Sequence, residues 1–506
     1  MKADWTLPSQ GKRRALLALL LISSLAVKFL FVFFFSNYTQ HLISDMGFYW
    51  ERAHARFSGN YFDLFQWHVN PPFFPMFLEQ FFKILYFLGL SKHELPILMM
   101  FFMVLSTLSV FCVYDIAAKL TAGFWRAFGA AVLYAFCYPV VYLHAFVLTE
   151  NLAIPLLIFV LWLVIIRDES PGLMFTAGLI FGVSTAIRMA FGLIGGFIFM
   201  YLGFSRPVSW KRIQRAMLFS LGFFLVIFFL LVENFFISKG ELRGLAGYSG
   251  FNTFLQYCKV RNVFSHYSGY SGVPHYNNPT FLWHHPEFGS FHTDHAFSDR
   301  AYFLGLVKGC IQNNPSIWTD NLKFFKDIFL YPPWPQFSDV GGHSFWMPFF
   351  WRILLFLSLS VGLFYWIAPR DRLWISRLTL LLSPFFSASV MCYFFTMEGR
   401  LLIPALFGLF VAFFAALPQL FKSYVKMVVY YICLLIFFAG CSLASHLEKN
   451  TLQEKYGVSS VQKTDFSRVS VRVPDGTPGI SGAFLLCPIH RAGFYWSQKL
   501  LLRPGK

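Results

Sequence analysis

The chain has 506 residues, of which 57% are hydrophobic and only 13% charged, and its mean hydropathy is +0.56. Soluble domains carry about 25% charged residues, so this composition excludes an ordinary soluble protein, and repeated apolar runs of about 20 residues predict a membrane protein with many spans. Lys and Arg in short loops explain the net charge of +17, as expected for cytoplasmic loops, and no nucleic-acid partner is predicted.

The first predicted transmembrane helix covers residues 15–35 and follows a basic segment, which places the N-terminus in the cytoplasm. Lys28 interrupts this helix, and we expect it to turn toward neighbouring helices or to reach the membrane surface. Residues 37–93 come next. They are too polar for a span and too aromatic for a free loop, which predicts one or two short amphipathic helices on the membrane surface.

The remaining predicted elements divide the chain into four parts. Within residues 1–237, further helices are expected at about 95–119, 128–147, 152–166, 173–186, 190–204 and 216–237. Residues 238–347 form a polar and aromatic insertion, in which 299–330 is expected to be helical. Residues 348–445 contain predicted helices at about 349–367, 378–395, 401–417 and 425–445, and residues 446–506 form a tail.

The predicted fold class is therefore an all-α polytopic membrane protein, a bundle of about 11 transmembrane helices with amphipathic outer-face helices and a mixed periplasmic insertion. Basic residues support one orientation of this bundle. The loops on one side carry most of the Lys and Arg, whereas the short loops on the other side hold only Arg188 and Arg400. The positive-inside rule then places 37–93, 238–347 and the tail outside, as in a bacterial inner-membrane protein.

The cysteines show no metal or redox motif, because no CxxC pair and no Cys/His pair at zinc-ligand spacing occurs. Cys258 and Cys310 both lie in the insertion. They can form a disulfide if the insertion faces an oxidising compartment.

Polar residues gather at the predicted outer ends of the helices. Asp45 follows the first helix directly, and Glu150, Arg188 and Arg400 lie in short outer loops. Charges beside a membrane core are costly unless paired, solvated or functional, and each taken singly can be a helix cap or a headgroup contact. As a group they suit a lipid-phosphate substrate, with arginines for the phosphate and carboxylates for a proton or a divalent cation.

Several of these stretches resemble a known family. The pattern Asp45–Tyr49–Ala53, followed by Gly59-Asn60-Tyr61 and Pro71-Pro72, is similar to the first outer loop of GT-C glycosyltransferases. Within that superfamily, the chain most resembles bacterial relatives of protein O-mannosyltransferases and the lipid A aminoarabinose transferase. Supporting pieces are Leu148-Thr149-Glu150 and Arg400-Leu401-Leu402-Ile403-Pro404.

The resemblance implies an enzyme that transfers a sugar, with inversion, from a polyprenyl phosphate at the outer or lumenal face. It implies that Asp45 is the catalytic carboxylate that activates the acceptor. Glu150 would match a second acidic residue that helps to hold the acceptor or a divalent cation (Mg²⁺ or Mn²⁺), together with Asp45. Arg188 and Arg400 would hold the lipid phosphate, whose charge grows as it leaves.

The chain departs from the family pattern at two places. Met46 follows Asp45 where the family often has a second acid, which weakens the case for a metal there. His68-Val69-Asn70 stands where the aminoarabinose-type pattern has a Lys before the two prolines, so His68 becomes the candidate phosphate contact. Further candidates for acceptor or metal contacts are Glu51, Glu398, His284 and His285.

The histidines of the insertion have irregular spacing without HxxxH or HExxH, so we interpret the insertion as an aromatic and polar loop over the site rather than as a metal centre. The favoured function is a membrane glycosyltransferase acting on a glycolipid, lipopolysaccharide, cell-wall glycan or protein acceptor. The alternatives are a lipid-linked-sugar flippase or transporter, an O-antigen ligase or polymerase that uses a diphosphate-linked donor, and a receptor or scaffold without chemistry.

Overall fold

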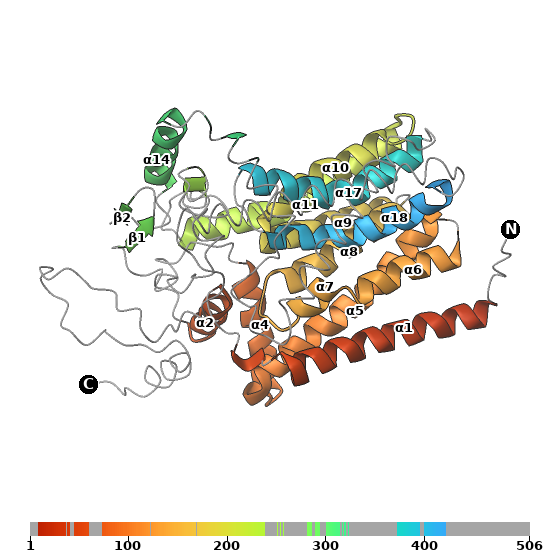
Figure 1. Ribbon diagram of the computed structural model, residues 1–506, viewed down its shortest axis with the longest axis horizontal. Coiled ribbons are helices and arrows are strands. Elements are labelled where there is room, and N and C mark those ends of the chain that lie inside the picture. The colour runs from red at the N-terminus through yellow and green to blue at the C-terminus, as the bar shows by residue number, and fades with distance from the viewer. Residues whose placement is uncertain are drawn as a thin grey trace, which may run out of the picture. The chain divides into compact units, whose positions relative to one another are not determined.

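The computed structural model describes residues 9–36, 38–40, 45–59, 73–121, 123–167, 170–237, 281–285, 289–293, 300–313, 372–394 and 399–420, with a few single positions between 250 and 322. All of them belong to the compact unit Met1–Ile436. This part of the chain is almost entirely helical (Figure 1). Four of its helices are long and apolar enough to cross a membrane: Gln10–Phe35, Ser91–Thr121, Trp210–Glu233 and Leu373–Phe394.

These four helices support the predicted membrane-protein class by their length and composition, whereas the number of spans stays a prediction. The predicted helices at 349–367 and 425–445 and the tail at 446–506 lie outside the described residues.

The first helix confirms its prediction and brings Lys28 into the interior. Helix α1 (Gln10–Leu30) continues as a π-helical turn, η1 (Phe31–Phe35). Lys28 is fully buried against α5 (Glu94–Thr121), where its Nζ donates hydrogen bonds to the Ser106 and Thr107 hydroxyls at 3.0 and 3.4 Å. Of the two expected positions for Lys28, the structure has the one turned toward a neighbouring helix.

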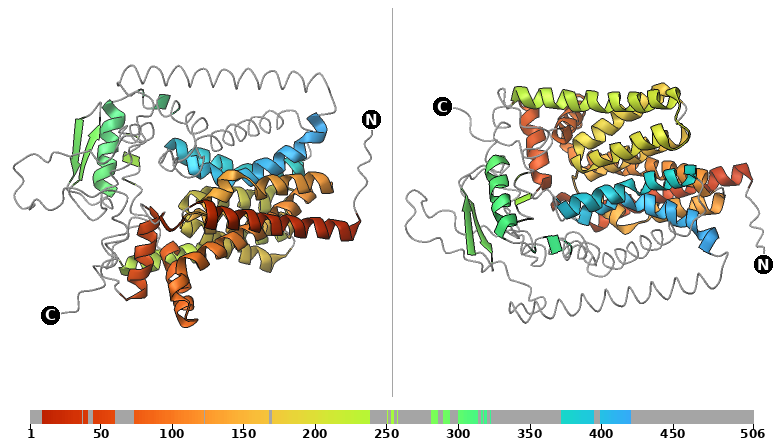
Figure 2. Two further views of the ribbon diagram at one scale, coloured as in Figure 1. Left: turned by 60° about the horizontal axis from the view of Figure 1, so that its bottom comes forward. Right: turned by 90° about the horizontal axis from the view of Figure 1, so that it is seen from above.

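The expected short helices in 37–93 are present as α2 (Asp45–Phe57) and α4 (Phe73–Phe87), with 3₁₀ turns at Tyr38–Gln40 and Ser91–His93. The two helices pack through aromatic rings. The Tyr49 and Phe74 ring centroids lie 5.1 Å apart, and the His54 ring stacks on Phe82 at 4.5 Å. Both helices lie at the end of the bundle opposite the start of α1 (Figure 2).

The predicted single helix over 128–147 is wrong. Helix α6 (Phe124–Ala135) ends early, and a short helix α7 (Tyr138–Leu143) follows with a proline at its start. Pro139 has no N–H and cannot continue the ladder of α6, so the chain breaks before it. Residues 144–149 form turns and irregular chain rather than helix, and all of them are buried.

Three shorter helices follow α7, close to their predicted positions: α8 (Glu150–Ile166), α9 (Pro171–Ile187) and α10 (Gly192–Phe204), with the 3₁₀ turn η5 (Met189–Phe191) before α10. Helix α8 is buried on nearly all sides. A helix that is apolar all round is expected in the centre of a bundle.

Helix α11 (Trp210–Ile237) packs against α9 through glycines. A methyl group on Gly178 would collide with the carbonyl of Phe219, and one on Gly182 would collide with Val226. Because both contacts advance in the same direction along the two helices, α9 and α11 run parallel. The end of α9 therefore lies at the level of the last turns of α11.

The insertion contains a hairpin and a helix. Strands β1 (Phe281–His285) and β2 (Gly289–Thr293) pair antiparallel, and α14 (Arg300–Asn313) confirms the helical prediction up to the Asn-Pro break. Trp318 packs against Phe394, the last residue of α17 (Arg372–Phe394). Cys310 is disulfide-bonded, while its expected partner Cys258 lies outside the described residues.

Within the described residues, two elements follow α17. The predicted helix at 401–417 begins as a 3₁₀ segment, η7 (Gly399–Ala405), and becomes α-helical as α18 (Leu406–Leu420). The Ser387 hydroxyl of α17 donates to the carbonyl of Ala190 at 2.7 Å, which ties α17 to η5. The C-terminal half of α17 and the chain between α9 and α10 are thereby held together.

Candidate functional site

Helix α2 presents one polar face to the bundle. Positions 45, 49, 52 and 56 follow a spacing of three and four residues, so they share one side of the helix. Tyr49, Arg52 and Arg56 on this side are buried, whereas Glu51 is exposed on the other side. Asp45 opens the helix on the buried side, although its side chain is outside what the structure describes.

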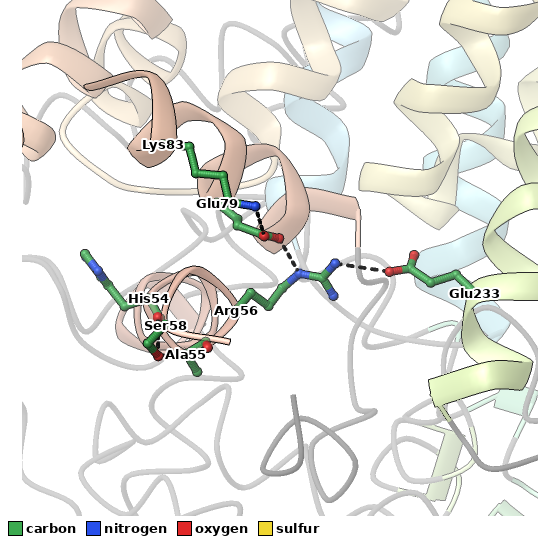
Figure 3. Close-up of polar contacts among 7 residues, drawn as sticks. All are labelled: His54, Ala55, Arg56, Ser58, Glu79, Lys83 and Glu233. Carbon is green, nitrogen blue, oxygen red and sulfur yellow. Dashed lines mark hydrogen bonds and ion pairs between the residues drawn. The ribbon is translucent and has the colours of Figure 1, made fainter. Parts of the chain in front are cut away.

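An ion-pair network joins α2 to α4 and α11. The Arg56 Nε donates to Glu79 at 2.8 Å, and its Nη2 donates to Glu233 at 3.1 Å (Figure 3). Glu79 also accepts from Lys83, one turn further along α4, at 2.7 Å. The Arg56 and Glu79 side chains are only 9% and 3% exposed, so these charges are satisfied by one another rather than by water.

A second side-chain contact ties α2 to α5. The Nε2 of His54 lies 3.2 Å from the Glu94 carboxylate, with a half-exposed histidine. Exposed pairs contribute about 0–1 kcal/mol to stability, whereas breaking a buried pair costs about 3–5 kcal/mol. The Arg56 network therefore does more to hold α2 in place.

The Glu79 carboxyl should make the stability of the protein depend on pH in the acidic range. Burial alone would raise its pKa, but the hydrogen bonds and charges of Lys83 and Arg56 together bring the pKa below its usual value of 4.5. Because the folded state favours the charged form, its contribution is present above that usual value and is lost as the pH falls through the lower folded pKa. We expect the thermal midpoint in detergent to fall on acidification below about pH 4.5.

The matched variant for that measurement is Glu79→Gln, which cannot titrate. It should be less stable than the parent at neutral pH, and the gap between the two proteins should narrow in acid. A gap that stays constant from neutral to acidic pH would contradict the assignment.

Two of the predicted site residues meet in the interior. Glu150 begins α8 and Arg188 directly follows α9, and Arg188 Nη2 lies 3.1 Å from Glu150 Oε1. The Thr149 hydroxyl donates to the other carboxylate oxygen at 2.8 Å. The Glu150 side chain is 1% exposed and that of Arg188 is 14% exposed. A carboxylate near a helix N-terminus also interacts favourably with the helix dipole.

The buried segment before α8 is held in place by Asn151. Its amide nitrogen donates to the carbonyls of Leu143 and Phe146 at 2.8 and 2.7 Å. The amide oxygen is therefore left as an acceptor, and it lies 2.7 Å from Nδ1 of His144, so that nitrogen carries the proton. These bonds satisfy irregular backbone inside the bundle and fix the position of Glu150.

The Glu150–Arg188 pair and the Arg56 network lie at the same end of the bundle. The parallel packing of α9 and α11 brings Arg188 to the level of Glu233. Ser184, one turn before the end of α9, donates to the carbonyl of Ala153 at 2.9 Å, so the start of α8 is at this level too. Arg400 belongs to η7, the segment that comes after α17 in the chain. Ser387 of α17 in turn contacts η5.

The other predicted site residues are placed less fully. His284 and His285 lie on β1 opposite Ser290 and Gly289, with side chains that the structure leaves undescribed. His68 and Glu398 lie outside the described residues. Within the part of the chain that is described, no three His, Cys, Asp or Glu side chains gather as metal ligands, and the expected divalent cation at Asp45 and Glu150 stays a prediction.

Sequence reasoning missed the partners of α2. Arg56, Glu79 and Glu233 are far apart along the chain, although the Glu79–Lys83 spacing inside an apolar helix was a usable signal. It also missed His144, a lone histidine in a predicted span.

No protein-family model matches the chain, and a search of curated proteins finds no match.

Proposed function

We propose that this protein is an integral-membrane glycosyltransferase of the GT-C type that uses a polyprenyl-phosphate-linked sugar. The acceptor would be a glycolipid, lipopolysaccharide, cell-wall glycan or protein, and the reaction would take place at the extracytoplasmic face. One observation carries the proposal: a buried Glu150–Arg188 pair lies at the same bundle end as the polar face of α2, on which residue 45 lies.

The proposed reaction is a single displacement. The acceptor hydroxyl oxygen attacks the anomeric carbon while its proton passes to the Asp45 carboxylate. The bond from that carbon to the phosphate oxygen breaks, and polyprenyl phosphate leaves with the electron pair. Arg188 and Arg400 stabilise the growing negative charge on the phosphate, and Glu150 orients Arg188 through their ion pair.

The decisive test is donor competition with the purified protein in lipid nanodiscs. We expect transfer from polyprenyl monophosphate sugars and none from diphosphate-linked oligosaccharides. Mass spectrometry of envelope glycans, lipids and proteins from cells with and without the gene should then show one missing sugar substituent, which names the acceptor. Transfer only from the diphosphate donor would instead favour the ligase or polymerase function.

A flippase or transporter is the second candidate, and buried Lys28 favours it. An ionisable residue inside a membrane span is often part of a transport path. Lys28 donates to the Ser106 and Thr107 hydroxyls, and two other charges of the predicted spans have protein partners as well, since Asp115 accepts from Trp162 at 2.7 Å and Glu233 accepts from Arg56. Movement of a lipid-linked sugar across vesicles by a protein without transferase activity would establish this candidate.

A further inference from the structure

The end of α4 exposes a group of apolar side chains, here called the α4 tip: Ile84, Tyr86, Phe87, Leu88 and Leu90. Phe87 is 88% exposed. The tip is a well-formed helix end, because Gly89 has a φ of +71° and the Leu90 amide donates to the carbonyl of Leu85 at 2.8 Å. Large apolar side chains gathered on a defined surface mark a binding surface.

The position of the tip identifies a lipid bilayer as what covers it. The candidate span Ser91–Thr121 begins directly after Leu90. Along α5 the exposed residues Phe101, Val104, Leu108 and Phe111 recur every three or four positions and form one apolar stripe. An exposed stripe on a spanning helix faces lipid.

This stripe continues onto α4. The Phe101 ring lies 5.7 Å, between centroids, from both Phe77 and Phe81 of α4. The flanking Lys92 is exposed, whereas the half-exposed Lys83 nearby holds Glu79 through its ammonium group. Lysines at the edge of an apolar surface place their ammonium groups among lipid headgroups while their stems stay in the apolar layer.

We propose that the α4 tip inserts into the membrane leaflet at the end of the bundle that carries α2. Helix α4 then connects the membrane to α2. Tyr86 of the tip contacts Phe57 at the end of α2, with ring centroids 5.8 Å apart, and Glu79 holds Arg56. The tip thereby sets the height of α2, and of residue 45, relative to the lipid surface. This membrane contact does not depend on the proposed chemistry.

The test is spin-label accessibility in nanodiscs, with single cysteines introduced as Phe87→Cys, Phe228→Cys and Glu51→Cys and the unsubstituted protein as the labelling blank. Phe228 is an exposed residue within the α11 span, and Glu51 is on the exposed side of α2. We expect the label at 87 to behave as the one at 228, accessible to oxygen and several-fold less accessible to a water-soluble nickel chelate than the one at 51.

Two results would overturn the proposal. Nickel access at 87 equal to that at 51 would place the tip in water. Protection from both oxygen and nickel would mean that protein, rather than lipid, covers the tip. Each label reports its position whether or not the protein transfers sugars, so failure of this proposal is distinguishable from failure of the proposed function.

Discussion

Replacing Asp45 with Asn is expected to lower sugar transfer by about 10²–10⁴-fold, the usual contribution of a general base. Asn keeps the size of the side chain and removes its ability to accept the acceptor proton. Residue 45 is the first residue of α2 and lies on the same side of the helix as buried Tyr49 and Arg56. Other contacts, such as the one from Arg56 to Glu79, hold this helix in place, so the substitution should not displace it. The measurement is transfer from a polyprenyl-phosphate sugar in nanodiscs, with protein level and thermal midpoint checked in parallel.

The matched control is Glu51→Gln: the sequence also offered this carboxylate as an acceptor or metal contact, but it lies on the exposed side of the helix, away from the polar face that carries position 45. It should retain most of the activity. Activity near the parent level in the Asp45→Asn protein would refute the proposed role of Asp45, whereas an equal loss in both variants would indicate that α2 needs negative charge in general rather than a base at one position.

Replacing Arg56 with Met should cost about 3–5 kcal/mol of stability, because Glu79 and Glu233 lose their shared buried cation. Lys83 continues to compensate Glu79 in part, since its contact to that carboxylate is separate. The measurement is reversible unfolding in mixed micelles, with the thermal midpoint in detergent as a second reading. Loss of the network should also release α2, so transfer activity should fall in the same variant.

Two controls separate the network from a general effect of substitution. His54→Gln removes a half-exposed pair on the same helix and should cost less than about 1 kcal/mol. The triple change of Arg56→Met, Glu79→Leu and Glu233→Leu removes all three charges and should recover part of the lost stability, because no uncompensated carboxylate remains. A single Arg56→Met protein as stable as the parent would contradict the assignment.

The positions of most helices followed from the sequence because a span must satisfy its own backbone in lipid and therefore needs a long apolar run. Helices α5, α9 and α11 lie close to their predicted ranges for this reason. The break between α6 and α7 and the irregular segment 144–149 did not follow, because apolar residues continue through both. Hydropathy reports burial, and a buried irregular segment held by Asn151 is as apolar as a buried helix.

The residues of the candidate site could be predicted from the sequence, but the contacts between them could not. A carboxylate or guanidinium beside an apolar run is visible in the sequence, and Glu150 and Arg188 were found in this way. Their pairing depends on α8 and α9 packing side by side. Arg56 had no local signal, since its partners are 23 and 177 residues away.

The sequence alone predicted a membrane protein and determined where its charged residues stand along the chain, because burial in lipid restricts composition over short stretches. The tertiary structure alone decided that Glu150 is neutralised by Arg188, that α2 is fixed through Arg56, and that the α4 tip stays exposed. Ion pairs between distant segments depend on helix packing, and packing is set by close contacts such as Gly178 against Phe219 that no short stretch of sequence contains.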